Sequence, residues 1–281
     1  MKLNHYPYKD KNHIFVNRDS RIKSRYEDIF PQDYMNQLQN KSGEADRFIE
    51  AAVAGFIAEQ PKAECLAYFK QAQQYQHINF YANIHPGENV TFCVKGVDIS
   101  MICEKRSGHA EISGWKDAFW LAIILREKAT LDLLCEYKSL DHLDSRAENL
   151  PFGHALCDFL QGVYNPKSDL QSLLNEVVRL SAPEFVPEHR QPFIYWVVMP
   201  FINIVLAVLA NDEAKYNNAI IKALESSYQY YTSTDRKKQL YQGWLPLHIH
   251  AGAALAYEQC GFKLSCKSPY IAEWLVYGDF E

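Results

Sequence analysis

The sequence lacks most of the patterns that identify a metal, redox or nucleotide site. Its seven cysteines are scattered and include no Cys-x-x-Cys pair, so we expect reduced and mostly buried thiols. Its glycines are isolated, which argues against a glycine-rich phosphate loop. No strict repeat period occurs either, which argues against a regular solenoid. We therefore expect no metal and no other cofactor.

Positive charge is scarce outside the first segment. Residues 1–25 hold seven Lys and Arg against two Asp and Glu, whereas the remainder holds 22 against 32, a net charge of -10. Nucleic-acid binding needs a basic footprint, which this acidic body does not provide. The charge balance therefore predicts no nucleic-acid partner and is compatible with a basic protein partner.

The first residues show no export signal. Residues 1–12 are charged and polar and lack the apolar centre of a signal peptide. We therefore expect the protein in the cytoplasm.

One long apolar run stands out, from Pro192 to Ala210. Its length approaches the roughly 20 residues that span a bilayer. Pro200 and Asn203 interrupt it, however, Asp212 and Glu213 follow closely, and no Lys/Arg cluster sets a topology. A helix that is apolar all round is also typical of the centre of a large helical protein. We therefore predict a buried core helix and no membrane association.

The remaining patterns predict a mainly α fold. Apolar periodicity and capping residues predict helices near residues 42–57, 61–69, 115–126, 130–137, 155–163, 168–177, 211–231 and 246–261. Between about residues 78 and 104 the residues become β-branched and aromatic, with alternation around Lys95-Gly96, which predicts a β-hairpin insert. We expect a basic arm over residues 1–24, loosely held, in which residues 13–16 could dock as a short strand. Residues 25–281 are expected to form one multi-helix globular domain of antiparallel helix pairs.

Three groups of residues could in principle carry chemistry. His248 and His250 lie two apart and would point to different faces of a helix, so they are not expected to share a metal ion. Cys157 with Asp158 and a histidine such as His154 or His189 has the residue types of a nucleophile and base, yet sequence alone does not bring them together. Carboxylates with near-helical spacing are more often a solvated helix face, and this reading is favoured for Glu127, Asp132 and Glu136.

Several strings resemble the immunity protein 49 family of bacterial polymorphic toxin systems, from about Ala45 to Val276. The hairpin is followed by Trp115 and then by Phe-Trp-Leu-Ala-Ile-Ile-Leu-Arg at 119–126. Asn-Asp-Glu at 211–213 precedes Ala-Leu-Glu at 223–225. Ala-Ala-Leu-Ala-Tyr at 253–257 leads through Gly261 to Ser-Pro-Tyr-Ile at 268–271 and Trp-Leu-Val at 274–276.

The resemblance implies a mostly helical, non-catalytic antidote. Members of the family are taken to be cytoplasmic proteins that neutralise a toxin delivered by neighbouring cells, commonly through type VI or related secretion. The leading hypothesis is an immunity protein that binds one cognate toxin and covers its active site. A non-catalytic helical scaffold or regulator that binds a peptide is the alternative, and an enzyme with dispersed residues is a third reading.

Acidic residues are the candidates for the toxin contact. If the toxin is a nuclease or another enzyme that acts on anionic substrates, its groove is basic, and acidic side chains in loops and at helix starts could occupy it. The candidates are Asp141, Asp144, Glu148, Asp212 and Glu213. At each position the competing reading is a solvated surface charge or stabilisation of a helix N-terminus.

Overall fold

The computed structural model describes residues 10–26, 44–94, 96–105, 110–142, 150–165 and 167–281. The first half contains α1 (Lys11–Tyr26), α3 (Glu44–Ile57), α4 (Lys62–Ile84), β1 (Asn89–Val94), β2 (Val97–Ile102), α5 (Ile112–Leu125), α6 (Lys128–Glu136) and the 3-10 turn η1 (Ser139–His142). The second half contains α7 (Pro151–Tyr164), α8 (Leu170–Leu180), α9 (Gln191–Phe193), the π-turn η2 (Ile194–Val198), α10 (Met199–Leu209), α11 (Glu213–Thr232), α12 (Asp235–Lys238), α13 (Tyr241–Trp244), α14 (Leu247–Cys260) and α15 (Glu273–Tyr277). The mainly α fold with one small hairpin is confirmed.

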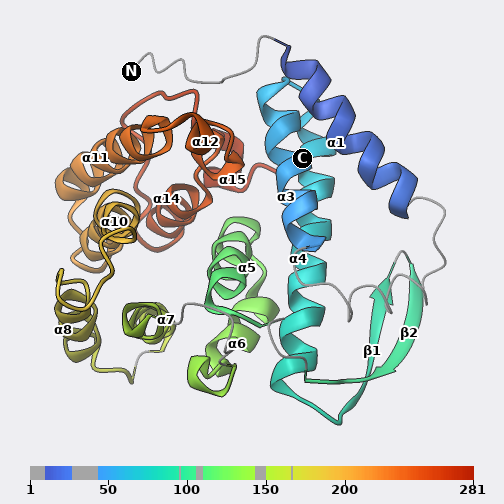
Figure 1. Cartoon of the computed structure of the whole chain (residues 1–281), viewed down its shortest axis with the longest axis horizontal. Coiled ribbons are helices and arrows are strands. Elements are labelled where there is room, and N and C mark those ends of the chain that lie inside the picture. Colours follow the sequence, from blue (N-terminus) through green and yellow to red (C-terminus); the bar gives the residue numbers. More distant parts are fainter. Residues whose placement is uncertain (1–9, 27–43, 95, 106–109, 143–149, 166) are drawn as a thin grey trace.

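Helix α5 lies at the centre of the molecule and contacts α4, α6, α7 and α14 (Figure 1). Its residues from Ala118 to Leu125 are all buried, as the unbroken apolar run predicts. Trp115 is fully buried, and its indole N–H donates to the Leu134 carbonyl oxygen at 3.0 Å. At the other end, Arg126 donates to the carbonyl oxygens of Leu275 and Val276 and so ties the last helix to α5.

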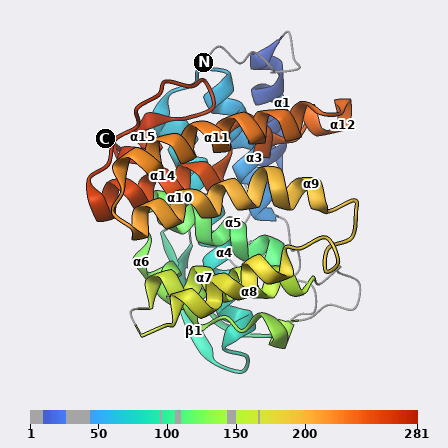
Figure 2. The same ribbon diagram turned by 90° about the vertical axis from the view of Figure 1, so that its left-hand side faces the viewer.

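Two packed groups of helices flank α5. On one side α3 and α4 form the expected antiparallel pair, with Phe48 and Phe69 fully buried. On the other side α10 packs on both α11 and α14, and Figure 2 shows α8, α10 and α11 running alongside one another. Gly252 of α14 lets α10 approach closely, because a Cβ added there would lie 2.9 Å from Ile204 Cγ2.

The apolar run at 192–210 is helical but only partly buried. It begins as α9, passes through η2 and continues as α10. The backbone N–H of Met199 donates to the Ile194 carbonyl oxygen, which closes the π-turn. Pro200 follows directly and has no N–H for a regular helical hydrogen bond, so the irregular turn lies where the ladder is already broken. By length and composition the stretch Gln191–Leu209 could cross a membrane, and half of it is buried. The predicted core helix is present over α10, most of which is buried, whereas Tyr195 and Trp196 of η2 are exposed.

The N-terminal expectation also needs correction. Residues 13–16 belong to helix α1, which packs on α3, and are not a strand. Phe15 and Ile22 are buried, and an Arg18–Glu50 ion pair of 2.7 Å joins the two helices, so residues 11–26 are not loosely held. The expected boundary between an arm and a domain, at residues 24 and 25, falls inside α1. The division of the chain into an arm and one domain stays a prediction.

The hairpin is present but shorter than predicted. Strands β1 and β2 pair antiparallel from Asn89 with Ile102 to Val94 with Val97. Residues 78–81, predicted to leave the helical pattern, continue α4 instead. Their apolar side chains are used by helical packing: Ile78 and Phe80 are buried, and the Tyr81 ring contacts Phe92 of β1 edge-on, with 5.6 Å between ring centroids.

Candidate functional site

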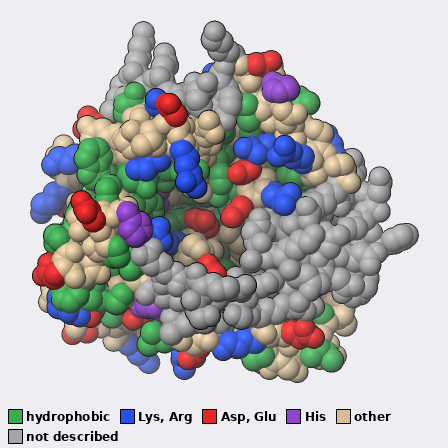
Figure 3. All heavy atoms as spheres, viewed as in Figure 1, with side chains coloured by type: hydrophobic (Ala, Val, Ile, Leu, Met, Phe, Trp, Pro, Cys, Tyr) green, Lys and Arg blue, Asp and Glu red, His purple; other side chains and the backbone are tan. Residues whose placement is uncertain are grey.

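A cavity of about 550 Å³ lies beside the N-terminal half of α5. Its walls come from α5, the start of α7, the stretch from α9 to the start of α10, the end of α11, α13 and the start of α14. We call it the central cavity. Its volume falls within the range of about 300–1,000 Å³ that is usual for ligand sites. Near the centre of the face shown in Figure 3 the surface is hollowed, and acidic and basic side chains border the hollow.

Two neighbouring residues of α5 place opposite charges in the lining. Lys116 and Asp117 are both partly buried. Burial lowers the pKa of Lys116, against the attraction of the neighbouring Asp117, and Arg190 lowers it slightly further. Burial raises the pKa of Asp117 to about 7, assisted by repulsion from the Asp46 carboxylate on α3 and opposed by the attraction of Lys116. The cavity surroundings therefore disfavour both charges.

The two charges do not neutralise each other by direct contact. Among the described residues, neither side chain forms an ion pair or hydrogen bond. The Lys116 ammonium lies 5.6 Å from the centroid of the Phe193 ring. A cation over an aromatic face at this distance is attracted to the ring, but the two partly buried charges lack direct ion-pair partners among the described residues, which is costly for a site that serves only packing.

Two further polar groups in the lining lack partners. Gln242 Oε1 and His248 Nε2 are inaccessible to solvent and form no hydrogen bond within the described parts of the chain. Burial and the neighbouring His250 and Lys116 lower the pKa of His248 to about 3, so its ring is neutral near pH 7. A neutral imidazole can donate or accept at Nε2, depending on its tautomer.

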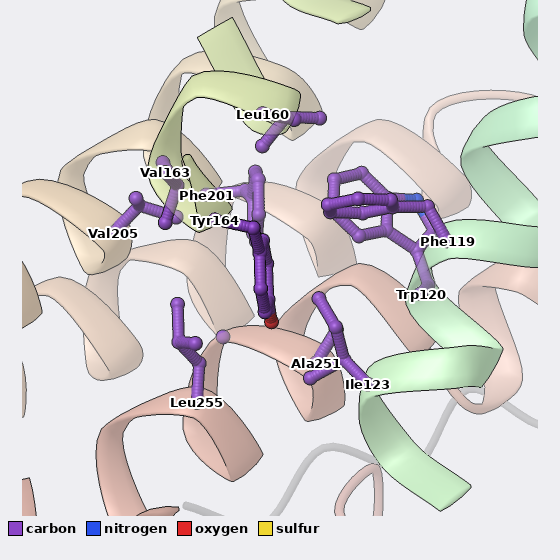
Figure 4. A pocket seen from close by; sticks show the side chains of 11 residues that line it. Phe119, Trp120, Ile123, Leu160, Val163, Tyr164, Phe201, Val205, Ala251 and Leu255 are labelled. Carbon is purple, nitrogen blue, oxygen red and sulfur yellow. The ribbon is translucent and has the colours of Figure 1, made fainter. Parts of the chain in front are cut away.

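The rest of the lining is apolar and aromatic. Trp120 and Phe201 meet edge-on, with their ring centroids 4.5 Å apart, and both also line a separate apolar void of about 10 Å³ (Figure 4). That void is bordered by α5, α7, α10 and α14 and is a packing defect. Tyr230, Tyr231 and Tyr241 bring three phenol rings to the central cavity.

Three of the five predicted toxin-contact residues are described, and none of these three lines the central cavity. Asp141 is exposed in η1, and its backbone carbonyl accepts a hydrogen bond of 2.7 Å from Lys105 Nζ. Asp212 caps α11 by accepting from the Lys215 backbone N–H at 2.9 Å, which lowers its pKa, and Glu213 is exposed in the first turn. Asp144 and Glu148 lie outside the described residues. A role in toxin contact stays a prediction for all five.

The two histidines of α14 have different surroundings. His250 is fully buried and lies 2.9 Å from the Pro246 carbonyl oxygen through Nδ1, while its Nε2 accepts from the Ala272 N–H at 2.9 Å. His248 faces the central cavity. Within the described residues, no cluster of His, Cys, Asp or Glu is arranged to hold a metal ion.

The members of the other two candidate groups that have printed contacts take part in packing, a hydrogen bond and a surface ion pair. Cys157 is buried, and burial raises the pKa of its thiol strongly. His154 Nδ1 lies 2.8 Å from Ser139 Oγ. The acidic residues Glu127, Asp132 and Glu136 are exposed, and Asp132 pairs with Lys128 at 2.6 Å.

Sequence reasoning missed the central cavity. Its polar groups come from α5, α13 and α14, which are far apart along the chain. One signal was available: Lys116 and Asp117 are the charged residues of an otherwise apolar buried helix. A charged pair at such a position is a candidate for a functional role.

Comparison with known proteins places the chain in a family. The model of the family described as Immunity protein 49 matches residues 35–275, which include every element from α3 to α14 and the first residues of α15. No curated protein and no solved structure gives a significant match. The family description indicates a role in toxin neutralisation. The chain belongs to the immunity protein 49 family.

Proposed function

We propose that this protein is a cytoplasmic immunity protein that binds one cognate toxin and neutralises it by covering the toxin's active site. The toxin would be delivered by competing bacteria through type VI or related secretion. The observation that carries the proposal is the family match over residues 35–275. It spans the helical core and every element that lines the central cavity.

Charge supports binding to a basic toxin surface. The protein has a net charge of -5, and Asp141 and Glu213 are exposed on different elements. Opposite charge on two proteins accelerates their encounter and fixes their orientation more than it adds affinity. A toxin with a basic substrate groove therefore fits this surface best.

The geometry of the possible nucleophile supports inhibition without catalysis. The thiolate is the reactive form of cysteine, and burial of Cys157 raises its pKa, so the thiol is held in its unreactive form. The nearby His154 lies within hydrogen-bonding distance of Ser139. We therefore propose that protection depends on stoichiometric binding.

A peptide-binding scaffold is the second candidate, and the central cavity is the observation that favours it. The cavity offers polar atoms of Gln242 and His248 that have no hydrogen-bond partner among the described residues, beside an aromatic wall. A scaffold would bind a peptide from a regulatory partner and would give no protection against a toxin.

Co-expression with the toxin encoded beside this chain tests the first proposal. We expect the wild-type chain to restore growth of cells that produce the toxin in the cytoplasm. A catalytically inactive toxin should co-purify with the chain at equimolar ratio and show loss of substrate access in the complex. An immunity protein for an unrelated toxin is the control. Growth arrest despite soluble expression, together with no complex, would refute the proposal.

A further inference from the structure

The lining of the central cavity carries charges of both signs. Lys116, Asp117 and Arg190 all line it, and Lys116 and Asp117 are adjacent residues of α5. The cavity therefore offers a basic and an acidic side chain to the same space.

The described parts of the chain satisfy these polar groups poorly. Burial disfavours both charges more than their mutual attraction favours them, and neither side chain forms an ion pair or hydrogen bond with another described residue. Gln242 Oε1 and His248 Nε2 add buried polar atoms that form no hydrogen bond with the described residues. Proteins retain few such groups unless a ligand or another function uses them.

We propose that the central cavity binds a zwitterionic group, with a cationic nitrogen against Asp117 and a carboxylate against Lys116. The acceptor Gln242 Oε1 suits a second N–H of the cationic end, and His248 Nε2 provides one further hydrogen bond. The apolar wall formed by Trp120 and Phe201 receives the uncharged part of the ligand.

This chemistry has two sources. One is a free amino acid or a short peptide. The other is a segment of the toxin that displays a basic and an acidic side chain together, and this second source rests on the proposed function. In both cases the charges of the ligand replace the lost hydration of Lys116 and Asp117.

The first arm of the test uses small ligands. The wild-type full chain is screened by thermal shift and calorimetry against the twenty L-amino acids and a set of dipeptides. We expect at least one of them to bind and to lose about tenfold or more of its affinity when its amine is acetylated or its carboxylate is esterified, because a charged hydrogen bond is removed in each case.

Matched variants locate the site. Lys116→Gln and Asp117→Asn should each weaken binding about tenfold or more. Lys128→Gln and Asp132→Asn make the same chemical changes in an exposed ion pair on α6 and should leave affinity unchanged. The melting temperature of the unliganded cavity variants should equal or exceed that of wild type, because burial disfavours each charge more than the neighbouring opposite charge favours it.

The second arm uses the toxin. Should no small zwitterion bind, the same four variants are titrated with inactive toxin, and the two cavity variants alone are expected to weaken the complex about tenfold or more. The proposal is overturned if no ligand of the panel binds and the two cavity variants bind the toxin as tightly as wild type. Unfolding of both cavity variants would also overturn it, because it assigns the charges a structural role. If wild type fails to bind toxin, the proposed immunity function fails separately, and the small-ligand arm alone decides the cavity proposal.

Discussion

Two histidines of α14, two residues apart, have opposite surroundings. His250 is enclosed by hydrogen bonds, because its Nδ1 must donate to the Pro246 carbonyl oxygen for its Nε2 to accept from Ala272 N–H. His248 ends at an unpartnered nitrogen in the central cavity. The same residue type therefore stabilises the fold at one position and is available to a ligand at the other.

Replacing His250 by Ala should destabilise the protein substantially. The substitution leaves the buried Ala272 N–H without its partner, whereas the Pro246 carbonyl oxygen keeps its backbone hydrogen bonds from Ile249 and residue 250. We expect a loss of about 1–3 kcal/mol in the free energy of unfolding measured by urea denaturation, the cost of one unsatisfied buried donor. His248→Ala is the matched control and should change the free energy by about 1 kcal/mol or less, because no hydrogen bond is broken. Equal losses in the two variants would contradict this assignment.

The Asp117 carboxyl should make stability depend on pH. Its pKa is raised from 3.8 to about 7, so the folded protein binds this proton more tightly than the unfolded chain does. Its contribution is therefore complete below about pH 4 and is lost as pH rises through 7. The groups that act on Asp117 are Asp46 of α3, Lys116 of α5, Tyr231 of α11 and Tyr241 of α13.

Asp117→Asn removes this titration and should stabilise the protein at pH 8. The gain is at most about 4 kcal/mol, from 1.36 kcal/mol for each pH unit between the two pKa values. Near pH 4 the variant and wild type should differ little. Thermal melts of both proteins between pH 4 and 8 measure the difference. A wild-type advantage that grows with pH would show that the carboxylate is stabilised in the fold.

At the scale of whole elements, the crossing of α10 and α14 depends on a small side chain. Gly252→Ala would place a Cβ 2.9 Å from Ile204 Cγ2, a branched methyl that cannot move freely. We expect a net destabilisation of about 1–2 kcal/mol, since overpacking by about 1–3 kcal/mol exceeds the gain in helix propensity. Gly114→Ala in α5 is the matched control, with Phe80 Cζ at 4.0 Å, and should stabilise by about 0.4–1 kcal/mol. The free energies of unfolding of the two variants are measured by chemical denaturation. If alanine acted only through its helix propensity, both variants would be more stable than wild type, which would contradict a packing requirement at Gly252.

The stretch from α9 to α10 serves both the core and the surface. Phe193, Ile194 and Phe201 line the central cavity, whereas Tyr195 and Trp196 are exposed. The π-turn η2 shifts the helical phase just before Pro200, so successive turns present different faces. An apolar sequence thereby forms one wall of the central cavity.

At the scale of the molecule, net charge should control association with a basic toxin. A combined Asp141→Lys, Asp144→Lys and Glu148→Lys variant should slow association and weaken its dependence on salt, while the dissociation rate changes less. Stopped-flow or surface-binding kinetics at two ionic strengths measure this. The control reverses Glu127, Glu225 and Glu273, which are exposed on other elements and change the net charge equally. Equal slowing by both triple variants would show that total charge matters and that the loop does not form the contact.

The sequence by itself determined the elements and the family. The stripe of α3, the apolar run of α5, the Asp212 cap of α11 and the Gly261 end of α14 all lie where periodicity and capping predict them, because each depends on neighbours within a few residues. Residues 78–81 were misread, since β-branched and aromatic residues also suit a buried helix face and only the packing of α4 decides between the two. The N-terminal helix α1 was not predicted, because its buried residues Phe15 and Ile22 are widely spaced in a polar segment and give no clear periodicity. Its packing on α3 is what identifies its buried face.

Only the tertiary structure decided the central cavity. Lys116, Gln242 and His248 meet because α5, α13 and α14 pack around a common space, and their separation along the chain leaves no local pattern. Their altered pKa values and missing partners likewise follow from desolvation, which depends on what surrounds a group in space. Local sequence governs where helices begin and end, whereas the environment of a side chain is set by residues that the sequence keeps far away.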